Sequence, residues 1–439
     1  MRKRENMIIY QLAPRTFTPE GTINAAKDLL PHIASLGVDI VYLCPVWVAE
    51  NDSDKSTWSE RQRASGTDNP KNPYKMADYY NVDDEYGTNE DLKSFVEEAH
   101  NNGLLVLFDL VYLHCGKSAV FIDEHPDFVI RNEDGSVFIA KEWPFARLNF
   151  DNPELRIYLR DNMEMFITEF GADGFRCDVG DYIPLDFWRE SFDYLKKIKP
   201  DLITLNEGRK AEYLDGGFDF SYNIAWNVLM LDIFCRDKPA SELEQRYNEE
   251  KEIYGDNVKR LLRTIDSHDI ASDCVLNRNE IDMTSRGVEA ALVITNTFDG
   301  VSFLWNGYEV CDRAENCMFS NRFFGRRSAS DWSRAFTADG VRRREFINKI
   351  HFVHHNCDAI VNGKMRWIKN SSSDEIAVYV KESDSQKLLV AVNCKNKKIT
   401  ASLSERFLIK DILMSYGMDV CEDNLQIEPY GFIIAEIQC

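Results

Sequence analysis

The sequence lacks an excess of basic residues. Its 52 Lys and Arg residues are outnumbered by 73 Asp and Glu residues, which gives a formal net charge of −21. Because binding to a nucleic-acid backbone or to an anionic membrane surface requires clustered positive charge, we expect neither of these partners. A soluble acidic protein accounts for this charge more simply.

Long apolar runs are also missing. No stretch reaches transmembrane length, and the basic N-terminus has only the strand-sized apolar run Met7–Tyr10 in place of the apolar core of a signal peptide. The eleven cysteines include no C-x-x-C pair, which argues against a zinc site and a disulfide framework. We therefore expect a cytoplasmic protein with reduced thiols.

Strand-like apolar runs alternate with amphipathic stretches from residue 7 to about residue 355. Eight such runs, nearly continuous in apolar residues, are typical of a parallel sheet covered by helices, and they predict an α/β fold with a (β/α)8 TIM barrel. The expected strands are Ile8–Gln11, Ile40–Leu43, Leu104–Asp109, Gly174–Asp178, Ile203–Asn206, Phe218–Phe220, Leu261–Ile265 and Ser302–Leu304.

Helices are expected between these strands. Thr88 precedes an acidic first turn and Gly103 follows at the expected end, which predicts a capped helix between them. The amphipathic stretches are Ala25–Leu36, Asn89–Asn102, Glu154–Phe170, Leu185–Lys197 and Arg286–Thr297.

Two connections are too long to be plain turns of a barrel. The polar segment Trp47–Pro73 follows the second strand, and the segment 115–149 follows the third and is expected to form a short insertion. The barrel then comprises residues 1–114 and 150–355. Alternating strands separated by polar turns predict a C-terminal antiparallel β-sandwich in residues 360–439.

Three carboxylates end successive predicted strands: Asp178, Glu207 and Asp269. In a β/α barrel the carboxyl ends of the strands meet at the rim that carries the chemistry. Retaining glycosidases need two carboxyl groups roughly 5–5.5 Å apart, and side chains on adjacent parallel strands meet that spacing. Each acid taken alone is equally compatible with a helix N-cap or a loop hydrogen bond. Their order along the barrel favours a glycosidase.

Four further residues are candidate partners of these acids in a site. Arg176, two residues before Asp178, is either a partner that keeps this carboxylate ionised or a structural residue of the barrel. His114 and His268 are candidate sugar ligands or buried, hydrogen-bonded histidines. Tyr74 is a stacking platform for a sugar ring or a core aromatic residue.

The sequence resembles the α-amylase family, glycoside hydrolase family 13, almost from end to end. IYQLAPRTF and LGVDIVYLCPVW resemble the first two strands of that family, and DGVSFLWNGYE resembles its eighth. GFRCDV, TLNE and SHD resemble its three acid-bearing motifs. The resemblance implies a nucleophile at Asp178, a general acid/base at Glu207 and a transition-state stabiliser at Asp269.

The resemblance also implies a sugar-binding subsite made by Tyr74, His114, Arg176 and His268, with Asp109 in a supporting role. It implies further that the insertion 115–149 is a short domain B after the third strand. Two departures from the family pattern stand out. Leu113 replaces the usual asparagine ligand of a structural calcium, so we expect no calcium, and no cofactor of any other kind. Gly180-Asp181 replaces a Lys-His pair that contacts the acceptor sugar in many α-amylases.

We therefore expect a retaining α-glycoside hydrolase that acts on short α-glucans and maltooligosaccharides through a covalent glycosyl-enzyme. A transglycosylase or sucrose-phosphorylase-like glucosyltransferase would use the same residues, and a non-catalytic carbohydrate-binding relative is a third possibility. The expected partner is an oligosaccharide. Arg322, Arg326 and Arg327 either favour a phosphorylated sugar or belong to a solvated loop. The sequence does not fix linkage, chain length, exo or endo mode, or oligomeric state.

Overall fold

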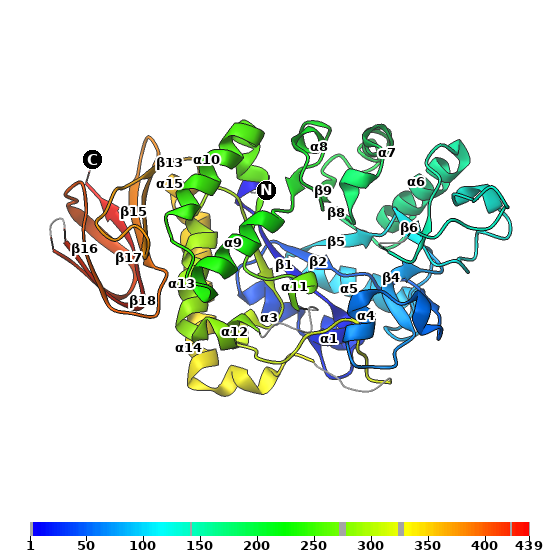
Figure 1. The fold of residues 1–439 in the computed structure, drawn as a ribbon, viewed down its shortest axis with the longest axis horizontal. Helices are drawn as coiled ribbons and strands as arrows, with labels where there is room; N and C mark the ends of the chain where they lie inside the picture. The colour runs from blue at the N-terminus through cyan, green and yellow to red at the C-terminus, as the bar shows by residue number, and fades with distance from the viewer. Residues whose placement is uncertain (1–2, 141–142, 272–277, 324–328, 422–423, 439) are drawn as a thin grey trace.

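The protein, described here from a computed structural model, is an eight-stranded parallel barrel followed in the chain by a smaller antiparallel sheet (Figure 1). The structure describes residues 3–140, 143–271, 278–323, 329–421 and 424–438. None of the helices within these ranges has both the length and the apolar character that crossing a membrane requires.

All eight predicted barrel strands are present. They pair in parallel in the order β10-β9-β8-β5-β2-β1-β12-β11, and a bridge between Ser221 and Leu261 joins the two ends. The (β/α)8 prediction is confirmed. The strands are β1 (Ile8–Leu12), β2 (Ile40–Leu43), β5 (Leu105–Leu110), β8 (Gly174–Cys177), β9 (Ile203–Asn206), β10 (Phe220–Ser221), β11 (Leu262–Arg263) and β12 (Val301–Trp305).

Helices surround the barrel, and their ends follow local sequence signals. Thr88 and Asp91 form a reciprocal capping box at the start of α5 (Asn89–Asn101), and Gly103 follows with φ at +75°. Other helices of the ring are α2 (Ile23–Lys27), α3 (Leu30–Ser35), α6 (Pro153–Thr168), α7 (Leu185–Leu195), α8 (Ala211–Asp215), α9 (Ile224–Cys235), α10 (Glu242–Tyr254), α13 (Thr284–Thr297) and α14 (Ala338–Asn356).

One helix prediction differs from the structure. The stretch Ala25–Leu36 was expected to be a single helix, but it divides into the end of α2 and the whole of α3. Pro31 occupies the first turn of α3. A proline lacks the backbone N–H and its ring clashes with the preceding turn, so the chain begins a new helix at this point.

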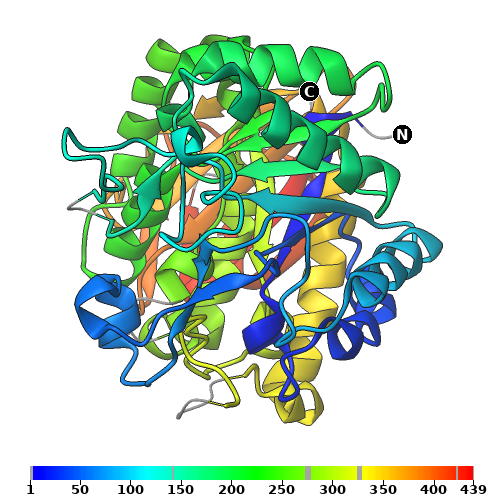
Figure 2. The same ribbon diagram turned by 90° about the vertical axis from the view of Figure 1, so that its right-hand side faces the viewer.

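The two long connections lie on the side of the molecule away from the C-terminal sheet (Figures 1 and 2). The first contains β3 (Ala49–Asn51), the short helix α4 (Glu60–Ala64) and β4 (Lys71–Met76). The segment 115–149 has little regular structure besides the pairing of β6 (His114–Cys115) with β7 (Ala146–Arg147). Both connections therefore reach the same end of the barrel.

The C-terminal strands are antiparallel, as predicted, but they form one curled sheet instead of two packed sheets. β17 (Ile409–Cys421) and β18 (Asn424–Ile437) make a long hairpin with register shifts, and Gly417 and Tyr430 have positive φ, which allows the sheet to bend. The other strands are β13 (Lys364–Trp367), β14 (Ile376–Glu382), β15 (Lys387–Asn393) and β16 (Ile399–Ser402).

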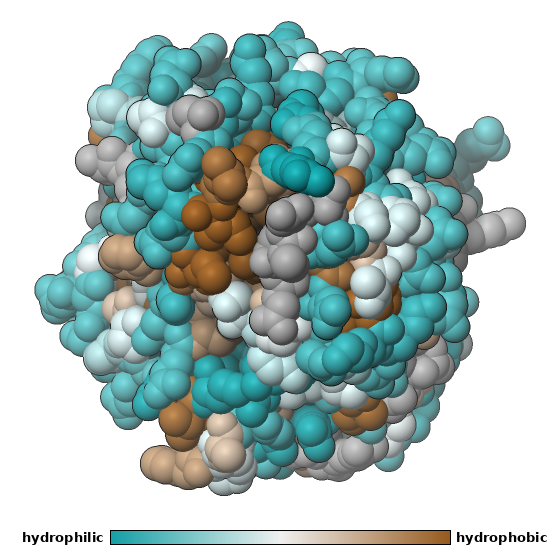
Figure 3. All heavy atoms as spheres, turned by 90° about the vertical axis from the view of Figure 1, so that its left-hand side faces the viewer, coloured by the Kyte–Doolittle hydropathy of each residue, from teal (hydrophilic) through white to brown (hydrophobic). Residues whose placement is uncertain are grey.

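The two faces of this sheet have different partners. Tyr379 and Phe432 belong to the core shared with the barrel, and the Tyr379 hydroxyl lies 2.6 Å from Thr297 Oγ1 on α13. The other face encloses a small apolar core of its own. The surface at this end is mostly polar, with one main apolar patch and a few smaller ones (Figure 3). Among the described residues from 364 onward, Leu408 and Ile412 are large hydrophobic residues that are exposed.

Candidate active site

A pocket of about 770 Å³ opens at the carboxyl ends of the barrel strands, and all three predicted acids line it. Asp178 follows β8, Glu207 follows β9 and Asp269 lies beyond β11. Side chains from both long connections also line the pocket. Its lining comprises Ser59, Glu60, Arg61, Asn72, Tyr74, His114, Trp143, Phe145, Asp178, Val179, Asp181, Tyr182, Glu207, Gly208, Arg209, Lys210, Ile224, His268, Asp269, Met318 and Phe319.

Arg176 holds two of the acids side by side. Its Nη1 donates to Asp178 Oδ1 at 2.8 Å and to Asp109 Oδ1 at 2.7 Å, and its Nη2 lies 2.8 Å from Glu207 Oε2. The guanidinium is fully buried, so these ion pairs act in a medium of low dielectric. One cation therefore fixes the positions of the predicted nucleophile and the predicted acid/base.

Burial governs the protonation of this carboxyl pair. It raises the pKa of Asp178 well above its usual value and also raises the pKa of Glu207, while Arg176 opposes both shifts. Negative charge on Glu207 raises the pKa of Asp178 further. Arg176 was one candidate for keeping Asp178 ionised, but burial has the larger effect on the pKa of this carboxyl. Because the charge of one carboxyl shifts the pKa of the other, the pair titrates as a unit.

The backbone between these acids is strained. Val179 has φ 40° and ψ 42°, a left-handed conformation that is rare for a β-branched residue. Its N–H donates to Glu207 Oε2 at 2.8 Å. Such a conformation costs roughly 1–3 kcal/mol and persists where the surrounding structure enforces it. The turn after Asp178 thus positions the Glu207 carboxyl.

A chain of hydrogen bonds fixes Tyr74 and His268. Burial lowers the pKa of His268 to about 4, so its ring is neutral at pH 7. Gln11 Nε2 lies 2.6 Å from His268 Nδ1, His268 Nε2 lies 2.8 Å from the Tyr74 hydroxyl, and this hydroxyl donates to Asp109 Oδ2 at 2.9 Å. Because Gln11 Nε2 donates to Nδ1 of His268, the proton of the neutral His268 ring is on its Nε2. The Tyr74 ring stacks on His268 with centroids 5.5 Å apart.

His114 presents an acceptor to the pocket. Its Nε2 lies 3.0 Å from the carbonyl oxygen of Tyr74, which requires the proton on Nε2, and its buried Nδ1 has no hydrogen-bond partner among the described residues. Burial lowers the pKa of His114 to about 3. Its ring stacks on Phe145 with centroids 4.5 Å apart. A hydroxyl of a bound ligand would satisfy the free nitrogen.

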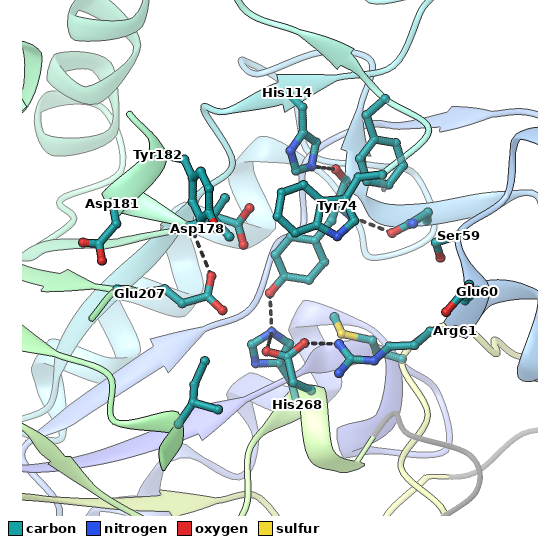
Figure 4. A pocket seen from close by; sticks show the side chains of 18 of the residues that line it. Ser59, Glu60, Arg61, Tyr74, His114, Asp178, Asp181, Tyr182, Glu207 and His268 are labelled. Atoms are coloured by element: carbon teal, nitrogen blue, oxygen red, sulfur yellow. Dashed lines mark hydrogen bonds and ion pairs between the residues drawn. The ribbon is translucent and has the colours of Figure 1, made fainter. Parts of the chain in front are cut away.

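Asp269 also lines the pocket and is paired with Arg61, which Figure 4 shows on the side of the pocket away from Glu207. Burial disfavours its charge, but His268, Arg61 and Arg176 outweigh burial and lower its pKa to about 2. Asp269 is therefore ionised at neutral pH. Arg61 comes from α4 in the connection Trp47–Pro73, far from Asp269 in the sequence.

The structure thus brings all seven predicted site residues to one region. Asp178, Glu207, Asp269, Tyr74, His114 and His268 line the pocket, whereas Arg176 lies beneath it and acts through the carboxylates. Arg61, Trp143, Phe145 and Tyr182 were not predicted. Arg61 lies in the connection Trp47–Pro73, Trp143 and Phe145 lie in the segment 115–149, and Tyr182 follows Asp178. No local pattern in the sequence distinguishes these side chains from their neighbours.

Two other positions singled out in the sequence lie apart from this chemistry. Leu113 is buried among apolar side chains. Arg322 donates to the carbonyl oxygens of Glu20 and Glu85, which is a structural role. Arg326 and Arg327 lie outside the described residues.

Comparisons with known proteins show similarity to α-amylases and cyclomaltodextrinases. The profile of a family described as "Alpha amylase, catalytic domain" matches residues 7–142. A cyclomaltodextrinase of Thermoanaerobacter pseudethanolicus is 26% identical over 313 residues, which cover 66% of this chain and 50% of that protein. The alpha-amylase MalA of Haloarcula japonica is 24% identical over 418 residues, covering 91% of this chain and 57% of that protein.

Solved structures show the same fold. A noncanonic maltogenic alpha-amylase of Thermotoga neapolitana superposes with a TM-score of 0.82 at 21% identity, and the match covers 99% of both chains. The chain spans about half of the first two curated relatives, at 50% and 57% of their lengths.

Proposed function

The chain belongs to the α-amylase family of glycoside hydrolases, and from this premise we propose that it hydrolyses α-glycosidic bonds in short α-glucans with retention of configuration. The observation that carries the proposal is the pair of carboxylates, Asp178 and Glu207, held on two nitrogen atoms of the buried Arg176 guanidinium. The ionised Asp269 across the pocket supports it. The cyclomaltodextrinase and maltogenic amylase relatives favour maltooligosaccharides as substrates.

In the first step, an oxygen of Asp178 attacks the anomeric carbon while Glu207 gives its proton to the departing glycosidic oxygen. The bond to the leaving sugar breaks and an ester to Asp178 forms. In the second step, Glu207 takes a proton from water, which attacks the anomeric carbon and releases Asp178. Two inversions return the α configuration.

The remaining residues assist both steps. The developing oxocarbenium-like charge is stabilised by the ionised carboxylate of Asp269. Tyr74 and His268 present a rigid surface to the sugar ring, and His114 Nδ1 accepts a hydrogen bond from a sugar hydroxyl. For the first step, Glu207 must carry a proton and Asp178 must be ionised when the substrate binds.

The stereochemistry of the product tests this mechanism. Proton NMR of a maltotriose digest, recorded before mutarotation, is expected to show the α anomer first. A β anomer as first product would contradict nucleophilic catalysis by Asp178. Products longer than maltotriose, or dependence of sucrose cleavage on phosphate, would identify a glycosyltransferase instead.

Arg61 offers a further test. Replacing it with Met leaves Asp269 without its ion-pair partner, and we expect kcat/KM to fall roughly 5-fold, because an exposed pair contributes up to about 1 kcal/mol. Lys at this position should restore most of the loss by restoring the charge. Arg63 lies on the same helix, and its Met variant should retain the wild-type kcat/KM. An unchanged Arg61→Met enzyme would remove Arg61 from this role.

Activity is expected to be insensitive to chelators. Leu113 offers no oxygen ligand to a hard cation such as calcium, and this prediction from the sequence has yet to be tested. Dialysis against EDTA should leave both kcat/KM and the melting temperature unchanged. A loss that Ca²⁺ restores and Mg²⁺ does not would contradict the prediction.

A further inference from the structure

The end of the pocket away from Glu207 is built from two distant segments of the chain. The segment 59–69 contains α4, and the segment 317–321 follows β12. Figure 4 shows the residues of α4 on the side of the pocket away from Glu207. We call these two segments the end wall. Their side chains that line the pocket are Ser59, Glu60, Arg61, Met318 and Phe319.

Buried hydrogen bonds join the two segments of the end wall. The carbonyl oxygen of Phe319 accepts from Asn69 Nδ2 at 3.1 Å and from Thr67 Oγ1 at 3.3 Å. Asn69 is fully buried. Gln62 Nε2 donates to the carbonyl oxygen of Asn69 at 3.0 Å, which ties α4 to this junction. The end wall is therefore one connected unit.

Arg15 fixes the end wall to the barrel. It lies in α1 (Pro14–Phe17), directly after β1, and it is buried. Its Nη1 donates to the carbonyl oxygen of Met318 at 2.6 Å and to that of Lys71 at 3.2 Å. Its Nε and Nη2 donate to the two carboxylate oxygens of Glu85, both at 2.8 Å. Because charge-assisted bonds of this kind hold the guanidinium in one geometry, the end wall is rigid.

The chemistry determines which part of a substrate meets this wall. The leaving oxygen departs from C1 of the reacting sugar and must lie within hydrogen-bond reach of Glu207. C4 is at the opposite corner of the pyranose ring, so the oxygen that continues an α-1,4-linked chain toward its non-reducing end points away from Glu207. The ion pair between Arg61 and Asp269 joins the wall to the catalytic residues on this side. The non-reducing side of the substrate therefore faces the end wall.

We propose that the end wall makes this enzyme exo-acting, so that only the non-reducing end of an α-glucan enters the pocket and the rest of the chain extends past Glu207. The inference rests on the proposed function. It names the substrate as a linear chain with a free non-reducing end. Cyclic glucans and the internal bonds of long chains are excluded, because both require space for sugars where the wall stands.

The test compares maltoheptaose with maltoheptaose whose terminal O4 and O6 are joined in an ethylidene acetal, so that the two chains differ only at the non-reducing end. We expect the blocked chain to be hydrolysed roughly 100-fold more slowly, because the acetal would overlap the end wall. Cyclomaltoheptaose, which has no end, should be hydrolysed as slowly as the blocked chain. Initial rates are measured by chromatography of the products.

An enzyme that cleaves internal bonds would hydrolyse both linear chains at similar rates, since the block lies several sugars from the bond that breaks. Similar rates on the two chains, or rapid opening of the ring, would therefore overturn the proposal. If neither linear chain is hydrolysed, the proposed function itself is refuted.

Two phenylalanines of neighbouring positions locate the wall. Phe319→Ala removes a buried ring from it and should raise the rate on the blocked chain, relative to the unblocked chain, by roughly 5-fold, because the shorter side chain leaves room for the acetal. The milder Phe319→Leu should change this ratio in the same direction. Phe323→Ala removes a ring that is 60% exposed and should leave the ratio as in the wild type. Thermal unfolding identifies which variants are folded, and a folded Phe319 variant with the wild-type ratio would contradict the assignment.

Discussion

Replacing Asp178 with Asn is expected to lower kcat/KM on maltooligosaccharides by roughly 10⁴-fold or more, because an amide oxygen cannot form the glycosyl ester. The variant is nearly isosteric, and Arg176 keeps Asp109 and Glu207 as partners. Burial of the Asp178 carboxylate is costly, so its removal should not reduce the melting temperature. Initial rates and thermal unfolding by circular dichroism measure the two effects.

The matched control is Asp256→Asn, which makes the same chemical change at an exposed position on the protein surface. It should retain both the wild-type rate and the wild-type melting temperature. An Asp178→Asn protein that keeps more than about one hundredth of the activity, after contaminating wild type is excluded, would remove Asp178 as nucleophile. A folded but inactive variant with an intact control is the expected pattern.

The barrel and its acids were predictable because they depend on local patterns. Each barrel strand is recognisable as an apolar run, and all the strands are parallel. An acid that directly follows such a run therefore lies at the carboxyl end of the sheet. Asp178 and Glu207 follow adjacent strands, and their meeting at Arg176 follows from the pairing of β8 with β9. Strand register places the two residues side by side, and Arg176 and the Val179 N–H then fix their carboxyl groups.

The rest of the site depends on long-range contacts. Arg61 is one of several polar residues in its segment, and only the fold brings α4 to Asp269. Tyr182 is positioned by Asp181, whose partners lie 25 or more residues away. Gln11 is a partial exception, because a polar side chain in an otherwise apolar strand suggests a buried partner, which proves to be His268.

Replacing Glu207 with Gln is expected to separate the two chemical steps. On maltotriose the loss should be roughly 10³-fold, since the leaving sugar needs a proton that the amide cannot give. Fluoride departs without this proton, so α-glucosyl fluoride should still form the glycosyl-enzyme. Azide, which attacks without a general base, should then restore turnover and yield an α-configured glycosyl azide identifiable by NMR.

The pH profile provides an independent readout of the same residue. Burial raises the pKa of Glu207, so its acid form persists to higher pH and is lost as pH rises through that pKa. The wild-type kcat/KM on maltotriose should fall along this basic limb, and the limb should vanish from the Glu207→Gln profile on α-glucosyl fluoride. The acid limb, which reports ionisation of Asp178, should remain in both profiles. A basic limb that survives the substitution, or azide products of β configuration, would assign the proton to another group and leave Glu207 as a binding residue only.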